Sequence, residues 1–325
     1  MKLLKPALYA VAGILVSAAA IVMMTAAVSS RKTDEQKPVV MAFSAVPDVP
    51  QQISIAGEEY DLTRYDMRER FDRELTSFCY SHNLTLQIIK RANRYFPIVE
   101  PILKQEGVPA DFLYLMAIES SLNQLALSPV KAASFWQLMP ATAREYGLEV
   151  NDSIDERYHI EKATRAACRY MKKAYSKYGN WMAVAASYNG GQGRITRELA
   201  RQKADDVFSL WLTEETTRYP FRMMALKTIM EAPYRYGFVV KSAQLYKPIR
   251  TTSVTIKTTI PDLVAFAAKH GISYREPKDF NPWLRGRSLP NKSGRTYELK
   301  IPVREDMIYS AKQKPVVYRK EWVVD

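Results

Sequence analysis

Cysteine and histidine are scarce in this sequence of 325 residues. The two cysteines, Cys79 and Cys168, lie inside helical patterns, where a buried free thiol is common, although in an exported protein they could also pair. The three histidines, His82, His159 and His270, are scattered and match no spacing of metal ligands. We therefore expect neither a metal site nor a cofactor, while the state of the two cysteines stays open.

No cysteine lies near the N-terminus, which excludes attachment of a lipid to an N-terminal cysteine. Residues 7–28 instead form an apolar run that is preceded by two lysines and followed by Arg31 and Lys32. A run of about 20 apolar residues can span a bilayer. It is longer than a typical signal-peptide core, although the small residues of "AAVSS" offer a cleavage site. We expect residues 1–30 to be a signal anchor rather than a cleaved signal peptide, and the rest to be exported to the periplasm or cell envelope.

Acidic side chains are fewer than basic ones. The sequence has 34 Asp and Glu against 47 Lys and Arg, a net charge of +13. Residues 241–325 hold 17 basic and 8 acidic side chains, so +9 of this charge lies in the last quarter of the chain. Such a balance suits polyanions, which include nucleic acid, anionic lipid and cell-wall polymer. A solvated, solubilising surface explains it equally well.

Internal repeats and low-complexity segments are absent, so changes of pattern divide the chain. Residues 31–60 are polar, contain three prolines and show no clear period, which indicates a linker. Residues 61–245 show helical spacing almost throughout. From residue 246 onward a strand-like alternation, a short helix and a second strand-like stretch follow one another. The sequence therefore predicts a mainly α protein that ends in a small α+β module over residues 246–325.

A single carboxylate, Glu119, lies at the end of the apolar run "FLYLMAIES", and residues 120–144 contain no Asp or Glu. Phe112, Leu115 and Met116 share the helix face of Glu119. Burial raises the pKa of a carboxyl group, and a glutamate that is protonated near neutral pH is what a general acid requires. From the spacing alone, an exposed glutamate at a helix end explains the pattern as well.

Several motifs follow Glu119 in order: Ser128, "WQLMP", "ASYNGGQG", and Tyr219 in "ETTRYPFRMMA". This order resembles the Slt-type lytic transglycosylases, goose-lysozyme-like enzymes that cleave peptidoglycan, over about residues 95–239. The resemblance implies a lysozyme-like, all-helical catalytic domain at residues 61–245. It implies that Glu119 is the catalytic acid and base. The positions that match substrate-binding residues of the family are Ser128, Gln137, Met139, Tyr188, Asn189 and Tyr219.

The reaction that the resemblance implies needs only one carboxylate and no cofactor. Glu119 would protonate the oxygen of the β-1,4 bond between N-acetylmuramic acid and N-acetylglucosamine. It would then take the proton of the C6 hydroxyl, which closes on C1 to give a 1,6-anhydro sugar. Residues 246–325, with the motif "FNPWL", resemble the LysM-like segments that follow this domain. We therefore expect peptidoglycan glycan strands as the partner, contact with the membrane through the N-terminal segment, and no nucleic acid; no protein partner is indicated.

The sequence departs from the family at Lys131 and Ser134, where glycine is usual and permits a positive φ. Such a change could alter the loop that carries Ser128. A non-catalytic wall-binding protein on the same fold is therefore an alternative.

Short motifs support a further alternative. Ser128 to Lys131, Ser187 to Asn189 and Lys292 to Gly294 match the S-x-x-K, S-x-N and K-S-G signature of penicillin-binding acyltransferases. The helical pattern of residues 61–245 speaks against that fold, which needs a large antiparallel sheet.

Overall fold

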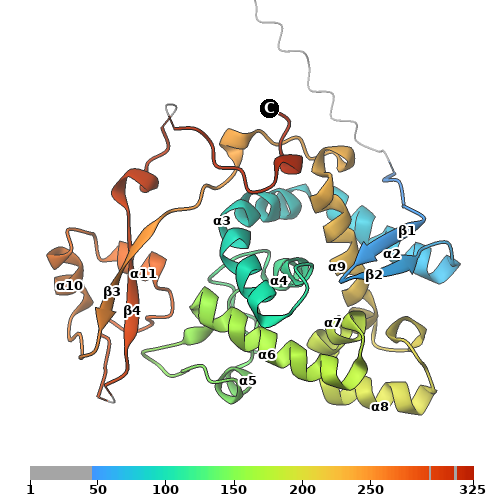
Figure 1. Ribbon diagram of the computed structural model, residues 1–325, viewed down its shortest axis with the longest axis horizontal. Coiled ribbons are helices and arrows are strands. Elements are labelled where there is room, and N and C mark those ends of the chain that lie inside the picture. Colours follow the sequence, from blue (N-terminus) through green and yellow to red (C-terminus); the bar gives the residue numbers. More distant parts are fainter. Residues whose placement is uncertain (1–45, 293, 311–312) are drawn as a thin grey trace, which may run out of the picture. The chain divides into compact units, whose positions relative to one another are not determined.

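The computed structural model describes residues 46–292, 294–310 and 313–325, and helices dominate them (Figure 1). Helix α4 lies among the other helices and packs against α3 and α9. This arrangement confirms the mainly α fold that the sequence predicts. The α-helices up to residue 231 are α2 (Tyr65–Tyr80), α3 (His82–Glu106), α4 (Phe112–Ser120), α5 (Pro140–Glu145), α6 (Ile160–Tyr178), α7 (Trp181–Gly190), α8 (Gln192–Gln202) and α9 (Glu214–Glu231).

Glycines end the two longest helices of this part. Gly107 follows α3 with φ of 71°, and Gly179 follows α6 with φ of 62°. The left-handed conformation lets the chain turn while the last carbonyl groups of the helix keep hydrogen-bond partners. On α6 the small residues Ala163, Ala167 and Ala174 are fully buried, so neighbouring helices can approach closely.

A β-hairpin precedes the helices and corrects the predicted linker. Strands β1 (Gln52–Ile55) and β2 (Glu58–Asp61) pair antiparallel, and the turn residues Ala56 and Gly57 both have positive φ. Ile53 and Ile55 are buried in the helical core. Residues 52–60 are therefore part of the folded unit and not of a linker. Positive φ at both central residues matches the twist of paired strands, but the sequence Ala-Gly is a weak signal for such a turn.

The C-terminal module is a small α+β unit, as predicted. Strands β3 (Thr251–Ile256) and β4 (Tyr297–Pro302) pair antiparallel, with Thr251 opposite Pro302 and Ile256 opposite Tyr297. Helices α10 (Leu263–Lys269) and α11 (Arg275–Phe280) lie between the strands in the sequence. A second core cluster is formed mainly by module residues, and Ala133, Ile154 and Tyr158 of the preceding part also belong to it. The largest module residues in it are Leu263, Trp283, Leu284, Leu289, Tyr297 and Leu299.

The chain returns to the helical core after the module. Trp322 is 1% exposed, and its Nε1 donates a hydrogen bond of 2.8 Å to the carbonyl oxygen of Met230 at the end of α9. Asn93 on α3 donates to the carbonyl oxygen of Val316 and accepts from the N–H of Tyr318. The last ten residues therefore complete the core of the helical part, although the sequence places them after the module.

Cys79 on α2 and Cys168 on α6 are buried free thiols, so the two cysteines do not pair. Within residues 46–292, 294–310 and 313–325, no helix combines the length and apolar character needed to cross a membrane. The predicted signal anchor at residues 7–28 lies outside the described residues.

Candidate active site

Glu119 is the one residue of α4 that is only partly buried, whereas the others are buried. Its carboxylate accepts a hydrogen bond from the hydroxyl of Tyr219 on α9. Helix α4 thus places a single carboxylate where the buried core meets an accessible surface. Tyr219, one of the site positions that the resemblance implies, therefore faces the glutamate.

Burial raises the pKa of Glu119 to about 7. The hydrogen bond from Tyr219 and the positive charge of Arg222 lower this pKa, whereas the negative charge of Glu215 raises it. Near neutral pH the carboxyl group is therefore present both protonated and ionised. Such a group can donate a proton and later accept one, which is the property of a general acid and base.

Helix α9 brings three polar groups to this carboxylate. Glu215, Tyr219 and Arg222 lie at positions i, i+4 and i+7, which places them on one helix face. Tyr219 was predicted from the resemblance, whereas Glu215 and Arg222 were not. Their spacing relative to Tyr219 was a signal in the sequence, but it indicates a function only once the partner of Tyr219 is known.

Ser128 lies in the loop of residues 121–139 between α4 and α5. Bridges of Ala133 with Leu127 and with Leu138 fold this loop back on itself. The Ala132 N–H donates a hydrogen bond of 2.9 Å to Ser128 Oγ. The Ser128 hydroxyl proton has no acceptor within the described part of the chain, so it can be donated to a ligand. Over residues 46–292 no hydrogen bond joins Ser128 to Glu119.

Tyr188 connects the loop to the helices. Its hydroxyl donates a hydrogen bond of 2.7 Å to the carbonyl oxygen of Trp136, whose Nε1 donates 2.9 Å to Thr164 Oγ1 on α6. Burial raises the pKa of Tyr188 well above its usual value, and the charge of Glu119 adds to the rise. Tyr188 is therefore a neutral donor near the candidate acid that also fixes the segment after Ser128.

Gln137 and Met139 follow on the same segment. Gln137 Nε2 donates to the carbonyl oxygens of Ser134 at 2.7 Å and Ala126 at 3.4 Å, which leaves its own Oε1 without a partner in the described structure. The Met139 side chain is 41% exposed. Both residues therefore offer a group that is not consumed by the fold, as a ligand-binding position requires.

Within residues 46–292, no hydrogen bond joins Asn189 to Glu119. Its Nδ2 donates 3.1 Å to Glu215 Oε1, and its Oδ1 accepts from Thr216 Oγ1 at 3.0 Å. Asn189 thus holds the start of α9, including the second carboxylate near the site.

The backbone at Lys131 and Ser134 is left-handed although neither residue is glycine. Their φ angles are 65° and 63°. The loop therefore keeps the conformation for which the family uses glycine, at a cost of about 1–2 kcal/mol for each non-glycine residue. Ser134 offsets part of this cost because its Oγ donates 3.0 Å to the carbonyl oxygen of Gln124.

The acyltransferase alternative is contradicted by this arrangement. Ser187 is fully buried in α7, and its hydroxyl donates to the carbonyl oxygen of Val184. Both sheets in the described part of the chain have only two strands. Among the residues that the structure describes, no group of three His, Cys, Asp or Glu side chains could hold a metal ion.

Comparisons with known proteins agree with the geometry. Residues 97–209 match the family described as "Transglycosylase SLT domain". Residues 252–305 match "Soluble lytic transglycosylase C-terminal LysM-like domain". Membrane-bound lytic murein transglycosylase D of Escherichia coli is 30% identical over 228 residues, which cover 69% of this chain and 49% of that protein. The chain thus spans about half the length of this relative.

Two solved structures are more distant. The 70 kDa soluble lytic transglycosylase of Escherichia coli aligns with a TM-score of 0.37 and 17% identity, over 52% of this chain and 31% of that chain. Lytic transglycosylase Slt of Pseudomonas aeruginosa aligns with a TM-score of 0.33 and 21% identity, over 40% and 22% of the two chains.

Proposed function

The chain belongs to the SLT transglycosylases and carries a LysM-like domain after the SLT domain, and from this premise we propose that it is a peptidoglycan lytic transglycosylase. The bond cleaved is the β-1,4 link between N-acetylmuramic acid and N-acetylglucosamine, and the product ends in 1,6-anhydro-N-acetylmuramic acid. The observation that carries the proposal is Glu119 itself: one partly buried carboxyl group, with a pKa of about 7, bonded to Tyr219.

Glu119 serves both halves of this reaction. In the first half its proton passes to the glycosidic oxygen while the bond from that oxygen to C1 breaks, and the N-acetyl carbonyl of the substrate stabilises the cationic sugar. In the second half the Glu119 carboxylate takes the proton of the C6 hydroxyl, whose oxygen bonds to C1. Proton donation and recovery by one group require a pKa near the working pH, and burial of Glu119 provides it.

Tyr219, Tyr188 and Ser128 support this proton transfer. The Tyr219 hydroxyl fixes the orientation of the carboxylate and stabilises its ionised form through the hydrogen bond. Tyr188 and Ser128 belong to the segments that enclose the substrate, and the Ser128 hydroxyl proton is free to bind it. Gln137 and Met139 contribute to the same binding surface, and Asn189 holds the start of α9.

Ordinary glycosidases use two carboxylates, and Glu215 is a second carboxylate near Glu119. Glu215 is exposed and accepts a hydrogen bond from Asn189. If Glu215 activated a water molecule, the product would be a reducing sugar instead of an anhydro sugar. The nature of the product end therefore separates a lytic transglycosylase from a hydrolase.

The experiment is digestion of purified cell-wall sacculi by the full chain, with release of soluble muropeptides as the measurement. We expect release by the natural sequence and at most a trace from Glu119→Gln. Equal release by both proteins would remove Glu119 from the mechanism. Binding to sacculi without any release would support the non-catalytic alternative.

We also propose how the chain is placed in the envelope. Residues 7–28 would anchor it in a membrane, supported by their length, their basic flanks and the relative described as membrane-bound. The SLT domain within residues 61–245 would carry catalysis and the LysM-like module within residues 246–325 would carry wall binding, while the last ten residues belong to the helical core. Alkaline carbonate extraction should leave the full chain with the membranes, and release of a protein that begins near residue 30 would contradict the anchor.

A further inference from the structure

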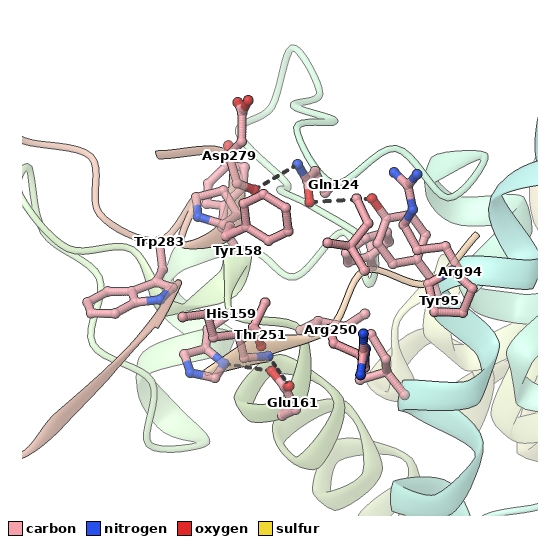
Figure 2. A pocket seen from close by; sticks show the side chains of 18 of the residues that line it. Arg94, Tyr95, Gln124, Tyr158, His159, Glu161, Arg250, Thr251, Asp279 and Trp283 are labelled. Carbon is pink, nitrogen blue, oxygen red and sulfur yellow. Dashed lines mark hydrogen bonds and ion pairs between the residues drawn. The ribbon is translucent and has the colours of Figure 1, made fainter. Parts of the chain in front are cut away.

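A cavity of about 560 Å³ lies where the helical part meets the C-terminal module. Its size is within the range of ligand pockets, roughly 300–1,000 Å³. Figure 2 shows the labelled side chains around it, with Arg94 and Tyr95 from α3 on one side and Tyr158 and Trp283 on the other. The helical part and the module both supply lining residues, and Glu119 is not among them.

All but one of the charged groups that line this cavity have a partner of opposite charge. Glu161 pairs with His159, at 3.2 Å, and with Lys300. Although burial raises the pKa of Glu161, the nearby His159 and the positive charge of Lys300 bring it down to about 2, so Glu161 stays ionised and paired with Lys300. Arg250 pairs with Asp306.

Asp279, the second carboxylate of the lining, pairs with Arg275. Arg94 is the lining cation that forms no ion pair with any residue of the described structure. Its Nε donates 3.0 Å to the carbonyl oxygen of Lys247, which fixes the side chain. Both terminal nitrogens of the guanidinium have no hydrogen-bond partner there. A fixed guanidinium edge of this kind binds carboxylates through two parallel hydrogen bonds.

The rest of the lining is largely apolar. Tyr95, Phe135 and Phe280 supply aromatic surface, and Ile98 and Ile249 supply aliphatic surface. The Tyr158 hydroxyl also has no hydrogen-bond partner among the described residues. His159 Nδ1 and Glu161 Oε2 are also buried without a hydrogen-bond partner among the described residues, although they lie 3.2 Å apart. The free guanidinium edge of Arg94, the Tyr158 hydroxyl and the apolar wall fit a ligand with a carboxylate and small apolar groups.

We propose that this cavity binds the peptide of peptidoglycan, a short anionic peptide with alanine methyl groups, through a carboxylate on Arg94. This inference rests on the proposed function, because under that function the substrate is peptidoglycan and its peptide lies close to the cleaved glycan. The glycan would occupy the surface at Glu119, while a peptide of the same polymer occupies the junction with the module. The second domain would then contribute to substrate choice and not only to wall attachment.

The cavity is also connected to the loop that carries Ser128. Gln124 and Phe135, which flank most of this loop, both line the cavity. Gln124 Nε2 donates 3.3 Å to the carbonyl oxygen of Asp279 in the module, and its Oε1 accepts from Tyr95 at 3.5 Å (Figure 2). A peptide in the cavity would contact both ends of the loop and favour one arrangement of it.

The binding test uses the full chain with Glu119→Gln, so that no substrate is consumed. The probes are the wall tetrapeptide without sugar, the same peptide with all carboxyl groups amidated, and a peptide-free N-acetylglucosamine tetramer. We expect the tetrapeptide to bind, and Arg94→Gln to weaken it about tenfold or more, because a charged hydrogen-bonded pair is lost. The amidated peptide should bind weakly, and its affinity should not depend on Arg94.

The matched control is Lys104→Gln, which removes an exposed positive charge from the same helix away from the cavity. It should leave tetrapeptide binding unchanged. A second variant, Ile98→Trp, keeps the cavity wall apolar but fills the cavity. It should also weaken binding of the tetrapeptide. The sugar tetramer should bind all of these proteins equally.

Activity gives an independent readout in the chain with Glu119 intact. Arg94→Gln should raise KM for intact peptidoglycan without changing it for glycan strands stripped of peptide. Failure of the tetrapeptide to bind, or equal loss of affinity in Lys104→Gln, would overturn the inference while leaving glycan cleavage as proposed. Peptide binding without any cleavage of sacculi would instead overturn the proposed function.

Discussion

The Tyr219 hydroxyl donates a hydrogen bond to the Glu119 carboxylate, although the two residues are 100 positions apart. Helices α4 and α9 pack together, so the bond is set by the core and not by a flexible loop. Burial disfavours the ionised carboxylate and the bond favours it, and burial is the larger effect.

The stability of Glu119→Gln should depend on pH. The pKa of Glu119 is raised from 4.5 to about 7 in the folded protein, so its contribution to stability is fully present below pH 4.5 and is lost as the pH rises through 7. Gln does not titrate. Relative to the natural sequence, the free energy of unfolding of the variant should therefore increase with rising pH, by on the order of 3 kcal/mol at pH 8. Urea unfolding at pH 5 and pH 8 measures this.

The control for that experiment is Glu145→Gln, at an exposed position paired with Lys173. Its stability difference from the natural sequence should be the same at both pH values. If the stability difference between Glu119→Gln and the natural sequence stays constant between pH 5 and pH 8, burial does not hold Glu119 in its protonated form.

Glu215→Gln should move the alkaline limb of the activity profile to lower pH. The charge of Glu215 raises the pKa of Glu119, so its removal lets Glu119 lose its proton more readily. The measurement is kcat/KM for sacculi as a function of pH. Glu214→Gln is the matched control, since Glu214 pairs with Arg73 and Arg218. Identical profiles for the two variants would contradict the role of Glu215.

Lys131→Gly should stabilise the protein by about 0.5–1 kcal/mol. Glycine adopts the left-handed conformation of residue 131 without strain, which outweighs its greater freedom in the unfolded chain. Lys131→Ala should not stabilise, because alanine keeps the strained Cβ. Val130→Gly, at the neighbouring exposed position with ordinary backbone, should destabilise. Thermal unfolding of the three variants decides whether the loop conformation is the one described.

Trp322→Ala should lower the free energy of unfolding by about 3–5 kcal/mol, as expected for removal of a buried aromatic side chain. Trp211→Ala is the control, because Trp211 is 84% exposed, and it should change stability by less than about 0.5 kcal/mol. A similar loss of stability in the two variants would show that the last ten residues do not complete the helical core.

Because Trp322 is buried in the helical core, a deletion of residues 246–325 would remove core residues as well as the module.

The sequence predicts the helices, the fold class and the lone glutamate because each depends on local spacing or on a motif. Tyr219, which the resemblance marks as a site residue, lies against Glu119. The return of Trp322 to α9 could not be predicted, because it depends on where the module brings the chain.

The hairpin at Ala56-Gly57 has a weak turn signal, and its stability depends on burial of Ile53 and Ile55 against distant helices. The pKa of Glu119 likewise depends on neighbours from α9 that only the tertiary structure brings near.

The chemical nature of the ends that the natural sequence leaves on digested peptidoglycan decides whether Glu119 acts alone as acid and base. Muropeptides are treated with borohydride, which reduces free sugar ends but not 1,6-anhydro ends, and are then analysed by mass spectrometry. We expect 1,6-anhydro-N-acetylmuramic acid ends that resist reduction and that are absent from a Glu119→Gln digest. Reducible N-acetylmuramic acid ends in the natural digest would contradict it, because water and a second carboxylate such as Glu215 would then take part.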